Sequence, residues 1–181
     1  MAELWDLYDV YGKRTGEVVQ RGLEGTAACE GVPEGRYHLV AIVWARTSDG
    51  SLLITQRAPE KSFGLSWECP GGAALAGESS LQAALREMKE ETGLAPAPEN
   101  GRLFCRFRRD GERTLFDVWL FRQEIALEDV VLQAGETIGA KLASTEEIRA
   151  MIEGGDFLPP ERVPYFEALA ARLKAGCLAE K

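Results

Sequence analysis

The chain has 181 residues, enough for a single domain with a sizeable hydrophobic core. Its 45% hydrophobic and 28% charged residues are typical of a globular protein, and its net charge of −8 argues against a surface that coats nucleic acid. No apolar run approaches the roughly 18 residues of a membrane span, and the N-terminal MAELWDLYDV lacks the basic and apolar regions of a signal peptide.

The cysteines and the histidine are too dispersed for a zinc site or a disulfide framework. The chain has four cysteines and one histidine, and no two cysteines have CxxC spacing. The cysteines are Cys29, Cys69, Cys105 and Cys177. We therefore expect reduced thiols and a cytoplasmic location, without a membrane or a nucleic acid polymer as partner.

The first third of the chain is predicted to be rich in β-structure. The runs of β-formers between turn residues predict a hairpin over 4–21, a loop with room for one helical turn over 22–35, strands over 37–45 and 52–56, and a loop over 57–66 that Trp67 closes. The two later strands flank the Ser48-Asp49-Gly50 turn, and we expect them to form a hairpin.

Helices alternate with strands in the rest of the chain. Capping residues, periodicity and turns predict a helix over 79–92, strands over 102–109 and 113–122, a further strand over 137–142, and helices over 144–153 and 161–175. The last helix is expected to bury Val163, Phe166, Leu169 and Leu173. This order indicates a single α/β or α+β domain.

The helix predicted over 79–92 carries an unusual acidic face. Ser79 and Gln82 form a capping box at its start, and Gly93 provides a left-handed stop. Beside an apolar stripe of Leu81, Ala84, Leu85 and Met88, three glutamates at spacings i, i+3 and i+4 share one side. These glutamates are Glu87, Glu90 and Glu91. They repel one another near the helix C-terminus, where the dipole favours cations, and a divalent cation with oxygen ligands would offset that cost.

The spacing around this helix resembles a known family signature. Gly72, Glu78, the Arg86-Glu87-Met88 triplet, Glu90-Glu91 and Gly93-Leu94 match the Nudix box at every defined position. The resemblance implies an α/β/α sandwich with a mixed β-sheet, in which the box forms a loop–helix–loop. It also implies one domain over 1–181, with a Nudix core over 36–181 and an N-terminal β-hairpin extension over 1–35.

The resemblance implies hydrolysis of a diphosphate linkage with Mg2+ or Mn2+. It makes Glu87, Glu90 and Glu91 the metal-facing carboxylates, and Glu90 and Glu91 are the first choice as direct ligands. Glu87 is either a ligand or the base that deprotonates the attacking water. Gly71 could contribute its carbonyl, and Glu78 is an additional or supporting metal group.

Further residues are candidates for orienting groups or binding the substrate. Arg86 is expected to orient carboxylates rather than touch substrate, while Arg57, Gln56 and Asp117 are substrate-binding candidates. Glu136 is a weaker outer carboxylate. Trp67 and Phe63 are expected to pack rather than stack on a base. A solvated hairpin is the simpler interpretation of the arginine cluster Arg106, Arg108, Arg109 and Arg113.

Two alternatives stay open at this point. The segment YHLVAIVWA…LLITQRAPEKSFGLSW is similar to isopentenyl diphosphate isomerases, but their Cys-Gly-His-Pro segment is matched by residues 71–74, Cys69 is out of register, and His38 is the only histidine. A non-catalytic nucleotide-binding Nudix module would commonly lack the glutamates retained here. The favoured substrate is a nucleoside diphosphate derivative or a similar small diphosphate, and the hairpin could support a homodimer.

Overall fold

The computed structural model describes residues 3–22 and 31–175. Its strands are β1 (Leu4–Tyr8), β2 (Arg14–Gln20), β3 (His38–Arg46), β4 (Leu52–Arg57), β5 (Trp67–Glu68), β6 (Gly71–Ala73), β7 (Gly101–Arg109), β8 (Thr114–Arg122) and β9 (Thr137–Ala143). Its helices are α1 (Ser80–Thr92), α2 (Thr145–Gly154) and α3 (Phe166–Lys174). Among these described helices, none is long and apolar enough to cross a membrane.

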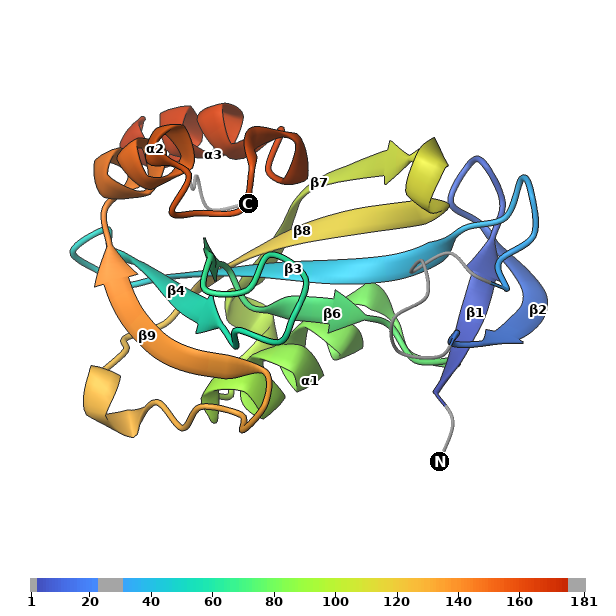
Figure 1. Cartoon of the computed structure of the whole chain (residues 1–181), viewed down its shortest axis with the longest axis horizontal. Helices are drawn as coiled ribbons and strands as arrows, with labels where there is room; N and C mark the ends of the chain where they lie inside the picture. Colours follow the sequence, from blue (N-terminus) through green and yellow to red (C-terminus); the bar gives the residue numbers. More distant parts are fainter. Residues whose placement is uncertain (1–2, 23–30, 176–181) are drawn as a thin grey trace.

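A mixed seven-stranded sheet forms the middle layer of the molecule (Figure 1). Its main path runs β5-β4-β3-β8-β7, with β6 on β3 and β9 on β4. One face packs on α1 through a core that includes Ala83, Ala84 and Met88, and the other packs on α2 and α3 around Trp44 and Leu169. The predicted α/β/α sandwich with a mixed sheet is therefore confirmed.

Strand β3 is the centre of this sheet. It pairs in parallel with β8 along its whole length, from His38 opposite Thr114 to Arg46 opposite Arg122. It also pairs antiparallel with β6, where Ala41 lies opposite Gly72. By contrast, β3 and β4 share only the Arg46–Leu52 pair next to their turn. The predicted hairpin of these two strands is thus correct at the turn and wrong beyond it, because β6 takes the place next to β3.

Several predicted boundaries differ from the structure. The last helix begins at Phe166 rather than near residue 161, because Pro164 lacks an N–H and disfavours helical geometry at the residue before it. A short 3-10 turn over Pro160–Arg162 precedes it. Strands β5 and β6 were not predicted, and Val10 lies beyond the end of β1. Most of the predicted loop over 22–35, together with Cys29 and Cys177, lies outside the described residues.

The N-terminal hairpin is a separate two-stranded sheet, β1–β2, beside the end of β3 (Figure 1). A backbone bridge joins Tyr8 to Tyr37, and Trp5 stacks on His38 with ring centroids 4.3 Å apart. Trp5, Leu7 and Val32 form a small core of their own. The predicted hairpin over 4–21 is confirmed, and it packs against the domain rather than projecting from it.

His38 makes the hairpin contact sensitive to acid. Its Nε2 lies 2.8 Å from the Thr114 hydroxyl, which itself donates to the Glu112 carbonyl, so Nε2 carries the proton of the neutral ring. Nδ1 is buried without a partner, and burial lowers the pKa of His38 to about 4. Protonation at Nδ1 would bury a donor that has no acceptor.

We expect this histidine to reduce stability as pH falls. The unfolded chain takes up the proton near pH 6.5 and the folded chain only near pH 4, so stability is lost across that window, by about 3 kcal/mol at its lower end. His38→Phe keeps a ring against Trp5 and cannot titrate. Denaturant unfolding of both proteins from pH 7 to pH 4 checks this, and an equal decline in the two would contradict it.

Candidate active site

The acidic helix α1 begins and ends where its sequence predicts. The Ser79 side chain accepts a hydrogen bond from the backbone N–H of Gln82, and the Gln82 side chain accepts one from the N–H of Ser79. Together they form a complete capping box. Gly93 ends the helix in a left-handed conformation with φ of 72°. Of the predicted apolar stripe, Ala84 and Met88 are fully buried, whereas Leu81 and Leu85 are half-buried. The buried side of the helix also includes an acidic residue, Glu91.

Glu91 is the least satisfied carboxylate among the described residues of this region. It is only 8% exposed, and its Oε2 is buried without a hydrogen-bond partner. Burial, together with the charges of Glu68 and Glu87, raises its pKa well above the ordinary value, although an N–H from Gly71 opposes the shift. Ionised Glu91 therefore has a strong electrostatic need for a cation.

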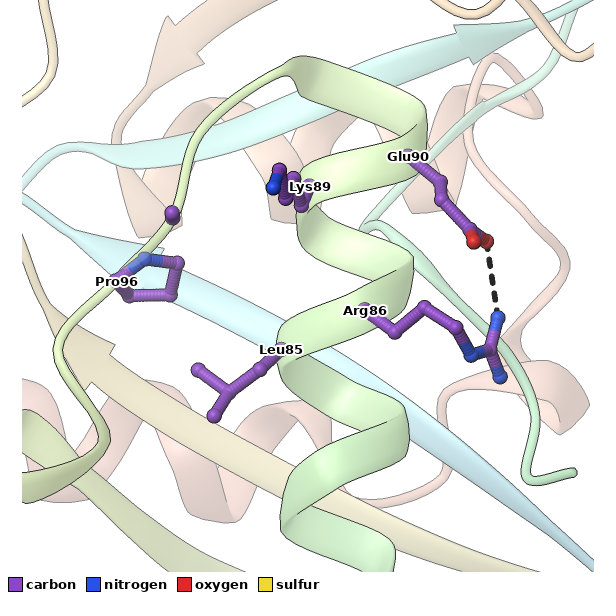
Figure 2. Close-up of a pocket in the computed structure, with 6 residues that line it drawn as sticks. Leu85, Arg86, Lys89, Glu90 and Pro96 are labelled. Carbon is purple, nitrogen blue, oxygen red and sulfur yellow. Dashed lines mark hydrogen bonds and ion pairs between the residues drawn. The ribbon is translucent and has the colours of Figure 1, made fainter. Parts of the chain in front are cut away.

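Arg86 gathers the other carboxylates of the box. Its guanidinium donates to Glu78 at 2.8 and 3.0 Å, to Glu87 at 2.7 Å and to Glu90 at 2.9 Å. A fourth partner, the carbonyl of Ala73, lies 2.9 Å away on β6. Figure 2 shows the Glu90 contact on the outer side of α1. The predicted contact of Arg86 with carboxylates is thus present in the structure, and it ties α1 to the loop before it.

Two glycines of β6 allow close approaches, Gly72 to α1 and Gly71 to β3. A Cβ on Gly72 would lie 2.4 Å from Oε1 of Glu87, and a Cβ on Gly71 would lie 2.4 Å from the backbone oxygen of Ala41. The Glu87 side chain is consequently only 14% exposed, and burial raises its pKa even though Arg86 opposes the shift. The absence of a side chain at Gly72 therefore allows Glu87 to lie against the backbone of β6.

Arg57 and Gln56 have structural partners rather than free ends. Arg57 donates to both oxygens of Glu68 at 2.7 Å and to the carbonyl of Ser62 at 2.7 Å. Gln56 donates to the carbonyl of Leu65 at 2.9 Å. Both side chains therefore hold the loop over 58–66 next to the carboxylates. Any contact with a substrate would require them to give up these bonds or to share them.

Glu68 belongs to the site and was not predicted from the sequence. Its side chain is 12% exposed, burial raises its pKa, and its charge raises the pKa of Glu91. The sequence signal that could have indicated Glu68 is the apolar–charged pair Trp67-Glu68, which directly precedes Cys69-Pro70-Gly71-Gly72. Lys61 forms an ion pair with Glu136. The charge of Lys61 also lowers the pKa of Glu91, so Glu136, the candidate outer carboxylate that pairs with Lys61, lies near the site.

Asp117 is fully engaged elsewhere. It is 1% exposed and binds Arg106 through both oxygens, at 2.5 and 2.7 Å. The arginine cluster serves the N-terminal segment: Arg106 reaches the carbonyl of Gly12, and Arg108 the carbonyl of Val10. Arg113 reaches the carbonyl of Val32, and Arg109 pairs with Glu112. These arginines are contacts of the fold, not merely a solvated face.

A second feature of α1 is an open depression on its outer side, of about 640 Å³. Its lining is mostly apolar, and Figure 2 shows four of its labelled side chains along α1 and Pro96 on the segment that follows the helix. It is lined by Leu85, Arg86, Lys89, Glu90, Ala95 and Pro96. Arg86 and Glu90 thus separate this depression from the buried carboxylates on the other side of the helix.

The described residues suit a divalent cation, although they are not pre-assembled around one. Within 3–22 and 31–175, no three acidic, histidine or cysteine side chains converge as a ready-made metal site. The reason is visible in the contacts, since Arg86 holds Glu87 and Glu90 while Lys61 holds Glu136. The donor set nevertheless fits Mg2+ or Mn2+: hard carboxylate oxygens, one of them orphaned in a buried position.

The groups needed for isomerase chemistry are not assembled. Cys69 is buried, its Sγ lies 4.0 Å from the Tyr165 hydroxyl, and burial raises the pKa of the thiol. Such a thiol stays neutral and inert. His38 lies in the contact with the N-terminal hairpin, stacked on Trp5. The candidate site therefore consists of groups on and around the acidic helix, and the isomerase-like flanks do not supply isomerase chemistry.

A mixed sheet between two helical layers, with a glycine–glutamate loop leading into an acidic helix, is the architecture of a Nudix-type enzyme. The NUDIX domain model matches residues 36–169. An uncharacterised Nudix hydrolase of Listeria monocytogenes is 33% identical over 159 residues, covering 87% of this chain and 89% of its own. An 8-oxo-dGTP diphosphatase of Haemophilus influenzae is 40% identical over 63 residues, which cover 35% of this chain and 45% of its own.

The crystal structure of DR0079 from Deinococcus radiodurans has the same fold. It aligns with a TM-score of 0.65 and 22% identity over 98% of this chain and 100% of its own. The chain therefore belongs to the Nudix family, and it is a hydrolase that acts on diphosphate bonds.

Proposed function

We propose that this hydrolase requires Mg2+ or Mn2+ and cleaves the diphosphate linkage of a nucleoside diphosphate derivative or a similar small molecule. The observation that carries the proposal is the buried, unpartnered Oε2 of Glu91 beside two further carboxylates, Glu68 and Glu87. A buried carboxylate without a partner is costly unless a cation offsets its charge. A diphosphate carries the same sign, so its approach would raise that cost further.

The residues that would hold the metal are those of the box. Glu91 and Glu90 are the proposed direct ligands, with Glu87 as a ligand or as the base, and the Gly71 carbonyl as a further donor. When bound, the metal would neutralise phosphate charge and lower the pKa of a water molecule. Glu68, paired with Arg57, adds a carboxylate close to Glu91.

The remaining residues of the box have supporting roles in this proposal. Glu78 accepts two hydrogen bonds from Arg86 and one from the N–H of Leu75, so we assign it to the support of Arg86 rather than to the first metal ligands. Arg86 in turn holds Glu87 and Glu90 in place. Arg57, Gln56 and Asp117 remain substrate-binding proposals, and each of them already has a protein partner.

A relative's name, the free cysteines and the exposed hairpin turn bear on the substrate, the location and the oligomeric state. The name of the Haemophilus relative supports a nucleotide as the organic part of the substrate. Cys69 and Cys105 are free, which suits a reducing, cytoplasmic location. Val10 and Tyr11 are 43% and 89% exposed at the hairpin turn, which supports a homodimer through that hairpin.

The test is a screen of nucleoside diphosphate derivatives and other diphosphates, with phosphate detection after coupled phosphatase treatment. We expect turnover with Mg2+ or Mn2+ and none with EDTA. A second arm offers isopentenyl diphosphate to the protein and to Cys69→Ala. Dimethylallyl product that depends on Cys69 would overturn the proposed diphosphate cleavage, whereas hydrolysis of equal rate in EDTA would overturn the proposed metal requirement.

A further inference from the structure

The N-terminal hairpin lies outside the residues that match the family model, yet it contacts the loop of the box directly. The match begins at residue 36, whereas β1 and β2 end by Gln20. The carbonyl of Leu4 accepts the N–H of Ala76 at 2.7 Å. The carboxylate of Asp6 accepts the N–H of Gly77 at 2.8 Å.

A third contact comes from the second strand of the hairpin. Arg14 donates to the carbonyl of Glu78 and pairs with Asp6 at 3.2 Å. The Asp6 side chain is only 16% exposed, so its bond to Gly77 is shielded from water. Figure 1 places β1 beside the chain that leads from β6 into α1. The hairpin therefore binds three successive residues of this loop through both of its strands.

These three residues determine where Glu78 lies. Gly77 has φ of 90°, a left-handed conformation that the bond to Asp6 holds in place. Glu78 follows directly, and its carboxylate accepts the N–H of Leu75 and two bonds from Arg86. Because Arg86 also binds Glu87 and Glu90, a displaced Glu78 would displace those two carboxylates as well.

The far end of the hairpin is anchored independently, which gives it the rigidity to act as a support. Arg108 donates to the carbonyl of Val10 at 2.9 Å, and Arg106 approaches the carbonyl of Gly12 at 3.5 Å. The backbone bridge between Tyr8 and Tyr37 fixes the hairpin to the start of β3. The hairpin thus spans the distance between the β7 arginines and the loop of the box.

We propose that the N-terminal hairpin is a structural part of the active site, in which Asp6 and Arg14 are positioning residues for the carboxylates that hold the metal. They act through Glu78 and Arg86, and they do not touch the metal or the substrate. The inference rests on the proposed metal dependence. It extends the functional unit beyond the residues of the family match.

A packing role alone would have different consequences. The small core of Trp5, Leu7 and Val32 attaches the hairpin by burial, and losing that attachment lowers the melting temperature. It would not alter metal affinity in the protein that stays folded. Asp6 and Arg14 contribute polar contacts to the loop, so their loss should alter metal affinity even where the fold is intact.

The test measures Mn2+ binding alone, by electron paramagnetic resonance of the free ion, without substrate. Asp6→Ala and Arg14→Met are each expected to weaken binding by about tenfold, the usual effect of removing a group that orients metal ligands. Asp6→Asn keeps an acceptor for Gly77 and should retain most of the affinity. Glu17→Gln removes an exposed charge of the same hairpin, which pairs with Arg36, and should bind as the wild type does.

A double-mutant cycle tests the route through Glu78. If Asp6 acts through Glu78, Asp6→Ala combined with Glu78→Gln should weaken Mn2+ binding no more than the stronger single variant. Wild-type affinity in folded Asp6→Ala and Arg14→Met, verified by circular dichroism, would overturn the inference and leave the proposed function intact. Mn2+ binding that is absent from the wild type itself would overturn both.

Discussion

Glu91→Gln is expected to abolish hydrolysis while making the metal-free protein more stable. The side chain is the buried carboxylate without a partner, so its loss removes a proposed metal ligand and also a buried charge. A metal ion supplies several kcal/mol of transition-state stabilisation, and about 4 kcal/mol corresponds to roughly a 10³-fold loss of kcat. Phosphate release with Mg2+ measures this effect.

The pH dependence distinguishes this outcome from simple damage. Folding raises the pKa of Glu91, so the folded chain holds this proton more tightly than the unfolded chain does. The stability associated with Glu91 is therefore present at acid pH and is lost as pH rises above the ordinary carboxyl range. Glutamine cannot ionise, so the melting temperature of the variant in EDTA should exceed that of the wild type at pH 8 and approach it at pH 5.

The matched control is Glu153→Gln, which replaces an exposed glutamate near the end of α2. It should leave both hydrolysis and melting unchanged. Unchanged turnover in Glu91→Gln would contradict the proposed role of the carboxylate. A lower melting temperature in EDTA at pH 8 would contradict the view that its charge is uncompensated in the absence of metal.

Arg86→Gln should have the second largest effect, this time on stability and activity together. The change leaves Glu78, Glu87 and Glu90 without their shared cation and removes the bond to the Ala73 carbonyl. The guanidinium is 22% exposed, and breaking such a partly buried network costs about 3 kcal/mol. Because the carboxylates are displaced, we also expect roughly a 10²-fold decrease in kcat.

Added Mg2+ provides a specific readout for this variant. Because Arg86 holds proposed metal ligands in place, its loss should weaken metal binding, so Mg2+ should raise the melting temperature of Arg86→Gln less than that of the wild type. Lys89→Gln is the control, since Lys89 is exposed on the same helix and has no side-chain partner among the described contacts. Equal effects of the two substitutions on unfolding would contradict the central role of Arg86.

The parts of the fold that the sequence predicted well are those with local causes. The ends of α1 follow from Ser79, Gln82 and Gly93, whose partners lie within one turn. The predicted start of a helix at residue 144 has the same kind of cause, since Ser144 and Glu147 form a capping box at the start of α2. The predicted acidic face was equally local, since helical periodicity alone brings Glu87 and Glu91 to adjacent turns.

The parts that were missed depend on partners far along the chain. Strand β6 consists of Gly71, Gly72 and Ala73, which show no apolar alternation, and it exists because β3 accepts a backbone without side chains next to Ala41. Glu68 lies on β5 and pairs with Arg57 on the neighbouring strand β4, a partner that the sequence around Glu68 does not indicate. The contact of Asp6 with Gly77 joins residues 71 positions apart, and no local pattern predicts it.

The parallel pairing of β3 with β8 has a consequence for how an active molecule forms. The ladder joins His38 to Thr114, which are 76 positions apart, and the whole of α1 lies in the chain between them. Closing so long a segment is slow, because its entropy is lost before the contacts of the ladder are gained. The box helix can form its first turns early, but the sheet face on which it packs is complete only after closure. During synthesis, a chain that has passed Leu94 but has not yet reached Arg122 therefore contains every glutamate of the box without the complete sheet that supports α1.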